Sequence, residues 1–334
     1  MAPFSLVVGF VPVLVFLGAL VLLDSYKLVT RRAVLRAIGV GCGAAALAGA
    51  VNLVALNGLD LKPALVQRYF APLVEETLKG LFLVYLIRTH RVGFMVDAGI
   101  QGFAVGTGFA LLENVYYARA LGDFVPVLWV VRGLGTAIMH GSATAIVGIV
   151  SKDLADRHAM PALRLFLPGL LIAVLVHSFF NHLARESLLT TCLLLLVMPL
   201  LLLLVFERSE KATRAWLGSG IDSDVELLEL ILSEGITASR VGRYLESLKS
   251  RFPGAVVADM LCLLRIYLEL SLAAKGILLA RSAGVRIPVD EHLRANFGEL
   301  RYLEKAIGPT GKLAILPFMR TSSRDLWQLY MLGR

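Results

Sequence analysis

Six side chains that can take part in hydrolysis lie in otherwise apolar stretches of this 334-residue chain. They are Glu75, Glu76, Glu113, His140, His177 and Asn181. A carboxylate in hydrocarbon costs roughly 2.5 kcal/mol or more, so an acidic residue inside a membrane indicates a functional site with partners elsewhere. Carboxylates and imidazoles can take a proton from water, and polar donors can stabilise an oxyanion. The set is typical of a site that activates water.

The spacing of these residues predicts which of them share a helix face. Glu75 and Lys79 are four residues apart, which favours an ion pair between them and leaves Glu76 unpaired. His177 and Asn181 have the same spacing and therefore lie on one face of a helix. His182 lies further round that helix and is a weaker candidate than His177 for a residue of the site.

The composition predicts a polytopic membrane protein, because 57% of the residues are hydrophobic, 17% are charged and the mean hydropathy is +0.75. Residues 1–206 hold 15 Lys and Arg and 10 Asp and Glu, whereas residues 207–334 hold 18 and 15. We therefore expect an all-α protein with a transmembrane domain over 1–206 and a soluble helical domain over 207–334. Helices are expected in the second part near 222–233, 237–250, 254–280, 288–306 and 323–332.

About seven membrane spans are predicted, because roughly 20 apolar residues cross the hydrocarbon core. They lie near 4–24, 37–58, 70–87, 97–118, 133–151, 165–186 and 188–206. The basic residues of the loops fall unevenly on the two sides. One side has Lys27, Arg31, Arg32, Arg36, Arg88, Arg91, Lys152, Arg157, Arg164, Arg208, Lys211 and Arg214, and the other has Lys62, Arg68, Arg119, Arg132 and Arg185. This asymmetry predicts an N-terminus outside and a C-terminus in the cytosol.

Three apolar stretches need an interpretation of their own. Residues 124–132 contain Trp129 and Arg132, which favours an outer interfacial segment with both side chains at headgroup level. Gly102 and Gly106 have the spacing that lets two helix backbones approach closely. The stretch 254–280 carries a charge every turn or two, which favours a core helix of the soluble domain over another span.

Helix rise places the six polar residues of the membrane part at a similar depth, in the outer half of the bilayer under the predicted orientation. They come from four helices, and independent packing residues would have no reason to share a depth. A water-filled catalytic pocket would require it. Two other classes remain open: a proton-coupled transporter, which would need such groups at several depths, and a non-catalytic membrane scaffold.

Four motifs in order on successive spans resemble the PrsW-type intramembrane protease family, which is related to the CAAX prenyl-protein processing endopeptidases. They are EETLK (75–79), GFALLEN (108–114), MHG (139–141) and HSFFN (177–181), and the resemblance covers about 70–185 closely. It implies proteolysis in or at the edge of the membrane, with Glu75 as general base beside Glu76. It also implies that His177 and Asn181 hold the oxyanion, while Glu113 stands where the CAAX relatives have His.

Two mechanisms stay open at this point. A carboxylate can activate water directly, or a divalent metal such as zinc can lower the pKa of a bound water. The candidate metal ligands are Glu76, Glu113, His140 and His177. The chain has no HExxH motif, the usual signature of zinc peptidases.

The expected partners are membrane lipid and a single-span membrane protein as substrate, similar to the anti-sigma factors cut by proteins that this chain resembles. We expect a bacterial cell membrane as its location and a regulatory partner for the cytosolic domain. Nucleic acid is not expected despite the net charge of +8, since many of the basic residues flank spans. Cys42, Cys192 and Cys262 have no CxxC spacing and predict no disulfide framework.

Overall fold

A computed structural model describes residues 3–121, 126–157, 162–183, 187–285, 287–319 and 323–332. All regular elements in these ranges are helices. The chain divides into two compact units, Met1–Glu210 and Lys211–Arg334. Each unit is described by itself.

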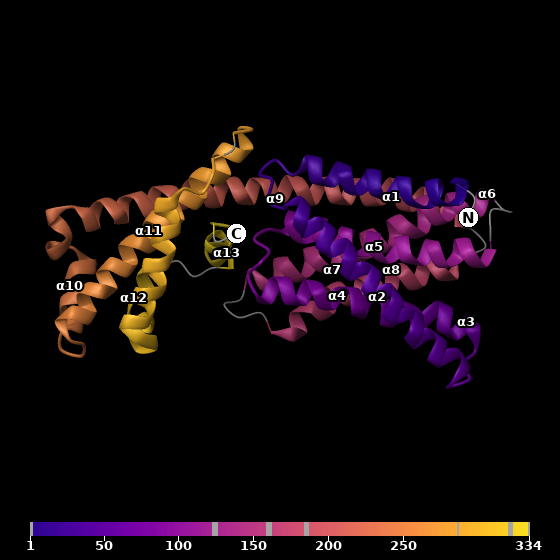
Figure 1. The fold of residues 1–334 in the computed structure, drawn as a ribbon, viewed down its shortest axis with the longest axis horizontal. Helices are drawn as coiled ribbons and strands as arrows, with labels where there is room; N and C mark the ends of the chain where they lie inside the picture. The colour runs from indigo at the N-terminus through magenta and orange to yellow at the C-terminus, as the bar shows by residue number, and fades with distance from the viewer. Residues whose placement is uncertain are drawn as a thin grey trace. The chain divides into compact units, whose positions relative to one another are not determined.

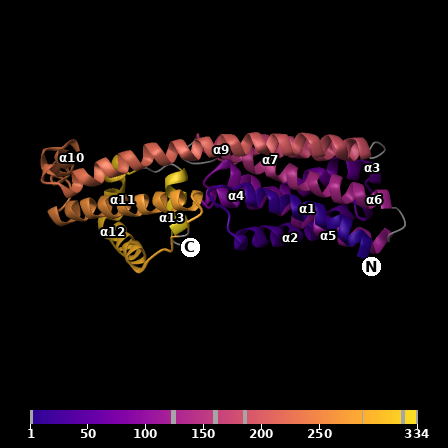
Figure 2. The same cartoon turned by 90° about the horizontal axis from the view of Figure 1, so that it is seen from above.

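The first unit is a helical bundle (Figures 1 and 2). Its elements are α1 (Pro3–Leu23), α2 (Arg31–Asn57), α3 (Pro63–Leu65), η1 (Val66–Phe70), α4 (Ala71–Arg88), α5 (Met95–Leu121), α6 (Pro126–Val130), η2 (Val131–Thr136), α7 (Ala137–Ala155), η3 (Leu163–Phe166), α8 (Leu167–His182) and the first part of α9 (Ser187–Leu232). Helix α5 packs against α7, α2 and α1, and α7 packs in turn against α8 and α4.

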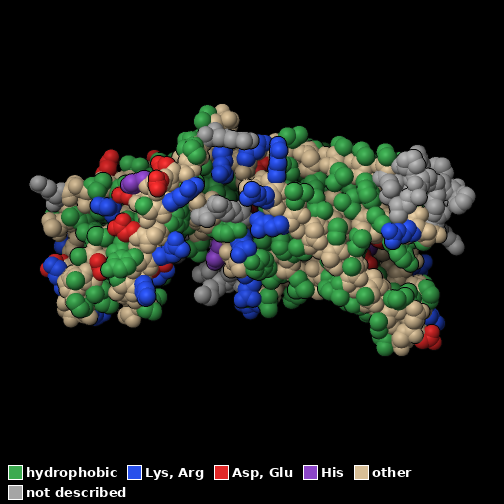
Figure 3. Space-filling view, viewed as in Figure 1, with side chains coloured by type: hydrophobic (Ala, Val, Ile, Leu, Met, Phe, Trp, Pro, Cys, Tyr) green, Lys and Arg blue, Asp and Glu red, His purple; other side chains and the backbone are tan. Residues whose placement is uncertain are grey.

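Five helices of the described residues are long and apolar enough to cross a membrane. They are Arg31–Asn57, Met95–Ala120, Val127–Ala155, Leu163–His182 and Thr191–Leu232, and Val7–Leu23 is a shorter apolar helix. The predicted third span, α4, is outside this set because its 18 residues include four charged ones. Hydrophobic side chains cover much of the face of this unit that is visible in Figure 3. The predicted all-α membrane bundle is confirmed.

Glycines allow α5 to touch α7 backbone to backbone. A Cβ at Gly102 would lie 2.6 Å from the carbonyl oxygen of Thr144, and one at Gly106 would overlap the carbonyl of His140. The close packing predicted for these two glycines is therefore present. It fixes the position of His140 relative to α5.

Two predicted boundaries were wrong. Residues 126–155 form one helical run through the π-helical turn η2, so no helix starts at the predicted boundary near residue 133. Trp129 and Arg132 are buried within the protein, because they pack against other helices of the bundle. Helix α9 also continues from Ser187 to Leu232 without a break after residue 206, so no separate helix begins near 222.

The second unit is built around α11 (Gly254–Ser282), as the charge pattern of 254–280 predicted. Its other elements are the end of α9, η5 (Glu234–Ala238), α10 (Arg240–Leu248), α12 (Glu291–Ile315), η6 (Leu316–Phe318) and α13 (Ser323–Leu332). Met260, Leu263 and Leu270 of α11 are fully buried in its core. Helix α12 runs on beyond the predicted end at 306 and kinks at Gly308, which has a φ of 66°.

Candidate active site

Helix α4 contributes three buried charged side chains: Glu75, Glu76 and Lys79. Lys79 Nζ lies 2.6 Å from Glu76 Oε1, and neither side chain is exposed. The predicted pair between Glu75 and Lys79 was therefore wrong. Residues three apart share a helix face as well as residues four apart do, and sequence spacing alone could not choose between them.

Helix α7 contributes His140, whose ring contacts a charged group on each side. Lys79 Nζ lies 3.1 Å from Nδ1, and Glu113 Oε2 of α5 lies 3.2 Å from Nε2. An ammonium can only donate a hydrogen bond, so Nδ1 is the acceptor. Nε2 then carries the hydrogen and donates it to Glu113.

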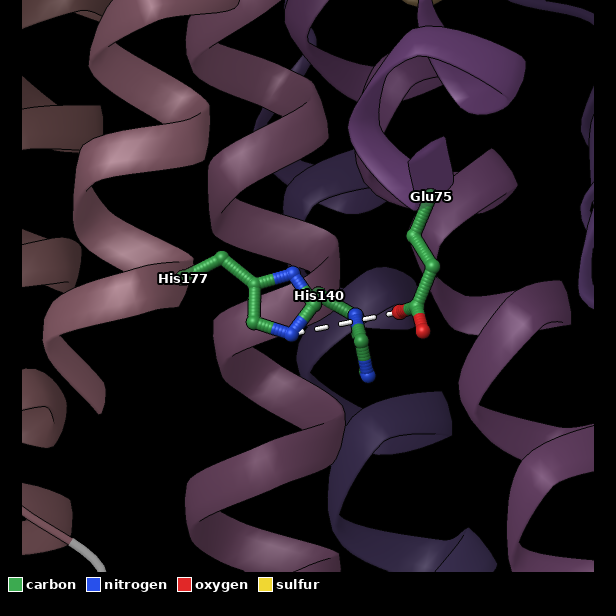
Figure 4. A group of neighbouring side chains, drawn as sticks. All are labelled: Glu75, His140 and His177. Atoms are coloured by element: carbon green, nitrogen blue, oxygen red, sulfur yellow. Dashed lines mark ion pairs between the residues drawn. The ribbon is translucent and has the colours of Figure 1, made fainter. Parts of the chain in front are cut away.

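Helix α8 contributes His177, which faces both glutamates of α4. Its Nδ1 lies 2.8 Å from Glu76 Oε1, and its Nε2 lies 3.9 Å from Glu75 Oε2. Glu76 pairs with Lys79 as a carboxylate, which only accepts hydrogen bonds, so Nδ1 of His177 carries the hydrogen. Its Nε2 therefore presents a lone pair to Glu75. Figure 4 shows Glu75, His140 and His177 converging from three helices.

Glu75 differs from the other two glutamates in its partners. Glu76 pairs with Lys79, and Glu113 Oε2 lies 3.2 Å from Arg132 Nη2. Glu75 Oε1 accepts a hydrogen bond of 3.2 Å from the Asn52 amide of α2, which leaves Oε2 directed at His177. Two permanent cations thus offset two of the three carboxylates, and the third is Glu75.

Sequence reasoning missed Asn52 and Arg132 as members of the site. Asn52 lies in an apolar span, and nothing in its spacing connects it to α4. Arg132 precedes His140 by eight residues, about two helical turns, which places both on one side of a helix. That spacing was the available signal, and the nearby Trp129 favoured an interfacial interpretation instead.

Asn181 is the one predicted site residue that the structure does not bring into the cluster. Its Nδ2 donates to the Gln67 carbonyl across 2.8 Å, and Ser178 Oγ donates to the Arg68 carbonyl across 2.6 Å. Pro72 lies four to five residues beyond these carbonyls and has no N–H to offer them. Side chains of α8 therefore satisfy backbone groups of η1, and the amide N–H of Asn181 is used in this contact.

A metal ion fits three of these residues. Glu75, His140 and His177 each offer a ligand atom, and these atoms lie within 4.8 Å of one another. Two imidazoles and one carboxylate form a donor set of catalytic zinc sites. Glu75 thus joins His140 and His177, whereas the predicted ligands Glu76 and Glu113 pair with Lys79 and Arg132.

The comparison with protein families agrees with this geometry. No curated protein and no solved structure matches the chain. The family model of the PrsW family intramembrane metalloproteases matches residues 29–205, which is more than half of the chain and includes every residue of the cluster. The chain belongs to the PrsW family of intramembrane proteases.

Proposed function

We propose that the protein cuts a membrane-anchored substrate with a water molecule activated between Glu75 and His177. The observation that carries this proposal is the distance of 3.9 Å between Glu75 Oε2 and His177 Nε2. Both atoms are acceptors in the hydrogen-bond pattern described above. A water placed about 2.8 Å from each could donate to both.

Glu75 is the residue that accepts the proton of this water. The two nearby glutamates, Glu76 and Glu113, already form ion pairs with Lys79 and Arg132. The Asn52 amide holds Oε1 of Glu75, so Oε2 is the oxygen that faces the water. Proton transfer to a positioned general base contributes about 10²- to 10⁴-fold to a rate.

In the alternative mechanism Glu75 is a metal ligand rather than the general base: a divalent metal, most simply zinc, held by Glu75, His140 and His177 would lower the pKa of its water toward about 7 and polarise the scissile carbonyl. The residues around these ligands orient them. Glu76 holds His177 by Nδ1, and Glu113 holds His140 by Nε2. His140 offers a ligand atom once either its contact with Lys79 or its contact with Glu113 is released.

The proposed substrate is a single-span protein, such as an anti-sigma factor, cut near the outer face of a bacterial cell membrane. A folded soluble domain cannot enter a space between packed helices. An extended segment next to a span can enter it, with its backbone groups satisfied by the pocket rather than by lipid. The excess of basic residues in one set of loops supports an N-terminus outside and a C-terminus in the cytosol.

The second unit is proposed to bind a cytosolic regulatory partner. Its described residues contain no group of three His, Cys, Asp or Glu side chains suited to hold a metal. Amphipathic helices such as α10 give it a water-facing surface that a partner could contact.

The experiment compares variants of the full-length protein, purified and placed in lipid, on single-span test proteins with a short extracellular part. Glu75→Gln and His177→Ala should each lower cleavage by at least about 100-fold. His182→Ala is the matched control, because His182 lies five residues after His177 and contacts Ser178 and Tyr69 outside the cluster. Cleavage at the wild-type rate in Glu75→Gln would overturn the proposal.

A further inference from the structure

Arg132 is a buried arginine at the edge of the proposed active site, on the π-helical turn η2 that leads into α7. Its side chain is only 10% exposed. A buried charge of this kind is rare unless it is paired. Its contacts therefore indicate what it is there to hold.

Three groups surround the guanidinium. Its Nη2 lies 3.2 Å from Glu113 Oε2, and its Nε donates to Asn114 Oδ1 across 2.9 Å. The group also lies 3.7 Å from the centre of the Tyr117 ring. All three partners belong to α5, so Arg132 connects η2 to one segment of that helix.

The Asn114 partner is itself fixed. Its Nδ2 donates to the carbonyl oxygen of Gly9 in α1 across 2.9 Å. A planar guanidinium with an ion pair, a hydrogen bond and a stacked ring has few alternative orientations. Arg132 is therefore a rigid support for Glu113.

The same oxygen of Glu113 contacts both Arg132 and His140. Oε2 lies 3.2 Å from Arg132 Nη2 and 3.2 Å from His140 Nε2. Arg132 keeps this oxygen charged and in place, and a carboxylate accepts the hydrogen of Nε2. That contact favours the same tautomer of His140, with its lone pair on Nδ1, as the Lys79 ammonium does from the other side of the ring.

We propose that Arg132 is a positioning residue of the protease: it fixes Glu113, and Glu113 fixes the orientation of the His140 ring through Nε2. The inference rests on the proposed function of the cluster. The π-helical turn contributes because its extra residue widens the helix just before α7, and such turns are frequent at functional sites. In this fold, the turn carries Arg132 beside α5.

The test is a double-mutant cycle on turnover of a single-span test protein. Arg132→Gln should lower kcat by about 100-fold with little change in KM, the cost of a slightly misplaced catalytic group. In the Glu113→Gln background, Arg132→Gln should change kcat by less than about threefold. The reason is that both substitutions break the same chain of contacts from Arg132 through Glu113 to His140. Arg119→Gln, an exposed arginine in the last turn of α5, should match the wild type. If the losses in kcat of Arg132→Gln and Glu113→Gln multiply in the double variant, the two residues act independently and the proposal is overturned.

A second measurement separates this inference from the proposed function. In full-length protein labelled with ¹⁵N-histidine, the ring signals of His140 can be assigned by their loss in His140→Gln. They should shift in Arg132→Gln and Glu113→Gln and stay unchanged in Arg119→Gln. This readout needs no cleavage, so a failure of the proposed function, seen in the Glu75 variants, is distinguished from a failure of the Arg132 proposal.

If Arg132→Gln does not insert into the membrane, Arg132→Lys replaces it in the double-mutant cycle. This variant keeps the positive charge but loses the bond to Asn114. Unchanged His140 signals in Arg132→Lys and Arg132→Gln would overturn the proposal.

Discussion

His177 contacts the two adjacent glutamates of α4 through different ring nitrogens: Nδ1 lies 2.8 Å from Glu76 Oε1, and Nε2 lies 3.9 Å from Glu75 Oε2. Two neighbours in the sequence therefore have different positions in the site. Glu76 holds the ring, and Glu75 faces the atom that the ring leaves available. The EE pair is best understood as one orienting carboxylate and one reacting carboxylate.

This division predicts how metal binding depends on each residue. Glu75→Gln and His177→Ala should abolish stoichiometric metal, because each removes a ligand atom. Glu76→Gln should weaken metal affinity by about 10- to 100-fold, as loss of an outer partner of a metal-binding histidine does. Quantitative metal analysis and titration with zinc measure this on purified protein, with His182→Ala as control. Full metal content in His177→Ala would contradict the assignment.

The buried pair of Glu76 and Lys79 predicts a strong coupling in stability. Lys79→Met should destabilise the protein by about 3–5 kcal/mol, because it leaves a buried carboxylate without its cation. The double variant Glu76→Gln/Lys79→Met should recover much of that loss. Unfolding in mixed micelles measures both. Equal stability of the single and the double variant would show that Glu76 has another source of compensation.

Asn181 predicts an effect on structure rather than on the oxyanion. Asn181→Ala should cost about 1 kcal/mol of stability through loss of its bond to the Gln67 carbonyl. Pro72→Ala restores a backbone N–H near that carbonyl, so it should offset part of the loss in the double variant. An oxyanion donor would instead lower kcat by about 10²- to 10³-fold. Kinetics and thermal unfolding of the three variants distinguish the two roles.

The sequence predicted the helices and most of the cluster for the same physical reason. Apolar runs of this length have few alternatives to membrane helices, and Glu75, Glu113 and His140 inside them need partners. What spacing could not predict was the choice among neighbours on one face. Lys79 pairs with Glu76 rather than Glu75, and Asn181 contacts a backbone carbonyl rather than the site.

Arg132 shows a second limit of the sequence. A basic residue beside Trp129 at the end of an apolar run is typical of a membrane interface. Its burial depends on the π-helical turn and on the close packing of α5 against α7. The spacing of Gly102 and Gly106 predicted a close helix approach but not the helix on the other side of it, and the π-helical turn has no reliable pattern in the sequence. The structure was needed to identify this residue.

The division into two units predicts that cleavage survives loss of the second one. Every member of the cluster lies within Met1–Glu210. A protein truncated after Arg214 should insert and keep its basal cleavage rate, while its regulation or choice of substrate changes. Cleavage by the truncated and full-length proteins in the same lipid checks this. Loss of all activity in a well-inserted truncation would place part of the catalytic machinery beyond Arg214.

The orientation in the membrane predicts which loops react with a reagent that cannot cross it. Leu59, between α2 and α3, and Arg157, after α7, are both exposed and suit cysteine substitution in a background without Cys42, Cys192 and Cys262. We choose these positions over Ser151, whose side chain is fully buried, and over Gly122, which lies outside the described residues. With the N-terminus outside, Leu59→Cys should react in intact cells, and Arg157→Cys only after the membrane is opened.

The reverse pattern would move the cluster to the cytosolic half, and substrates would then be cut on the inner side of their spans. Product termini mapped by mass spectrometry provide the independent check.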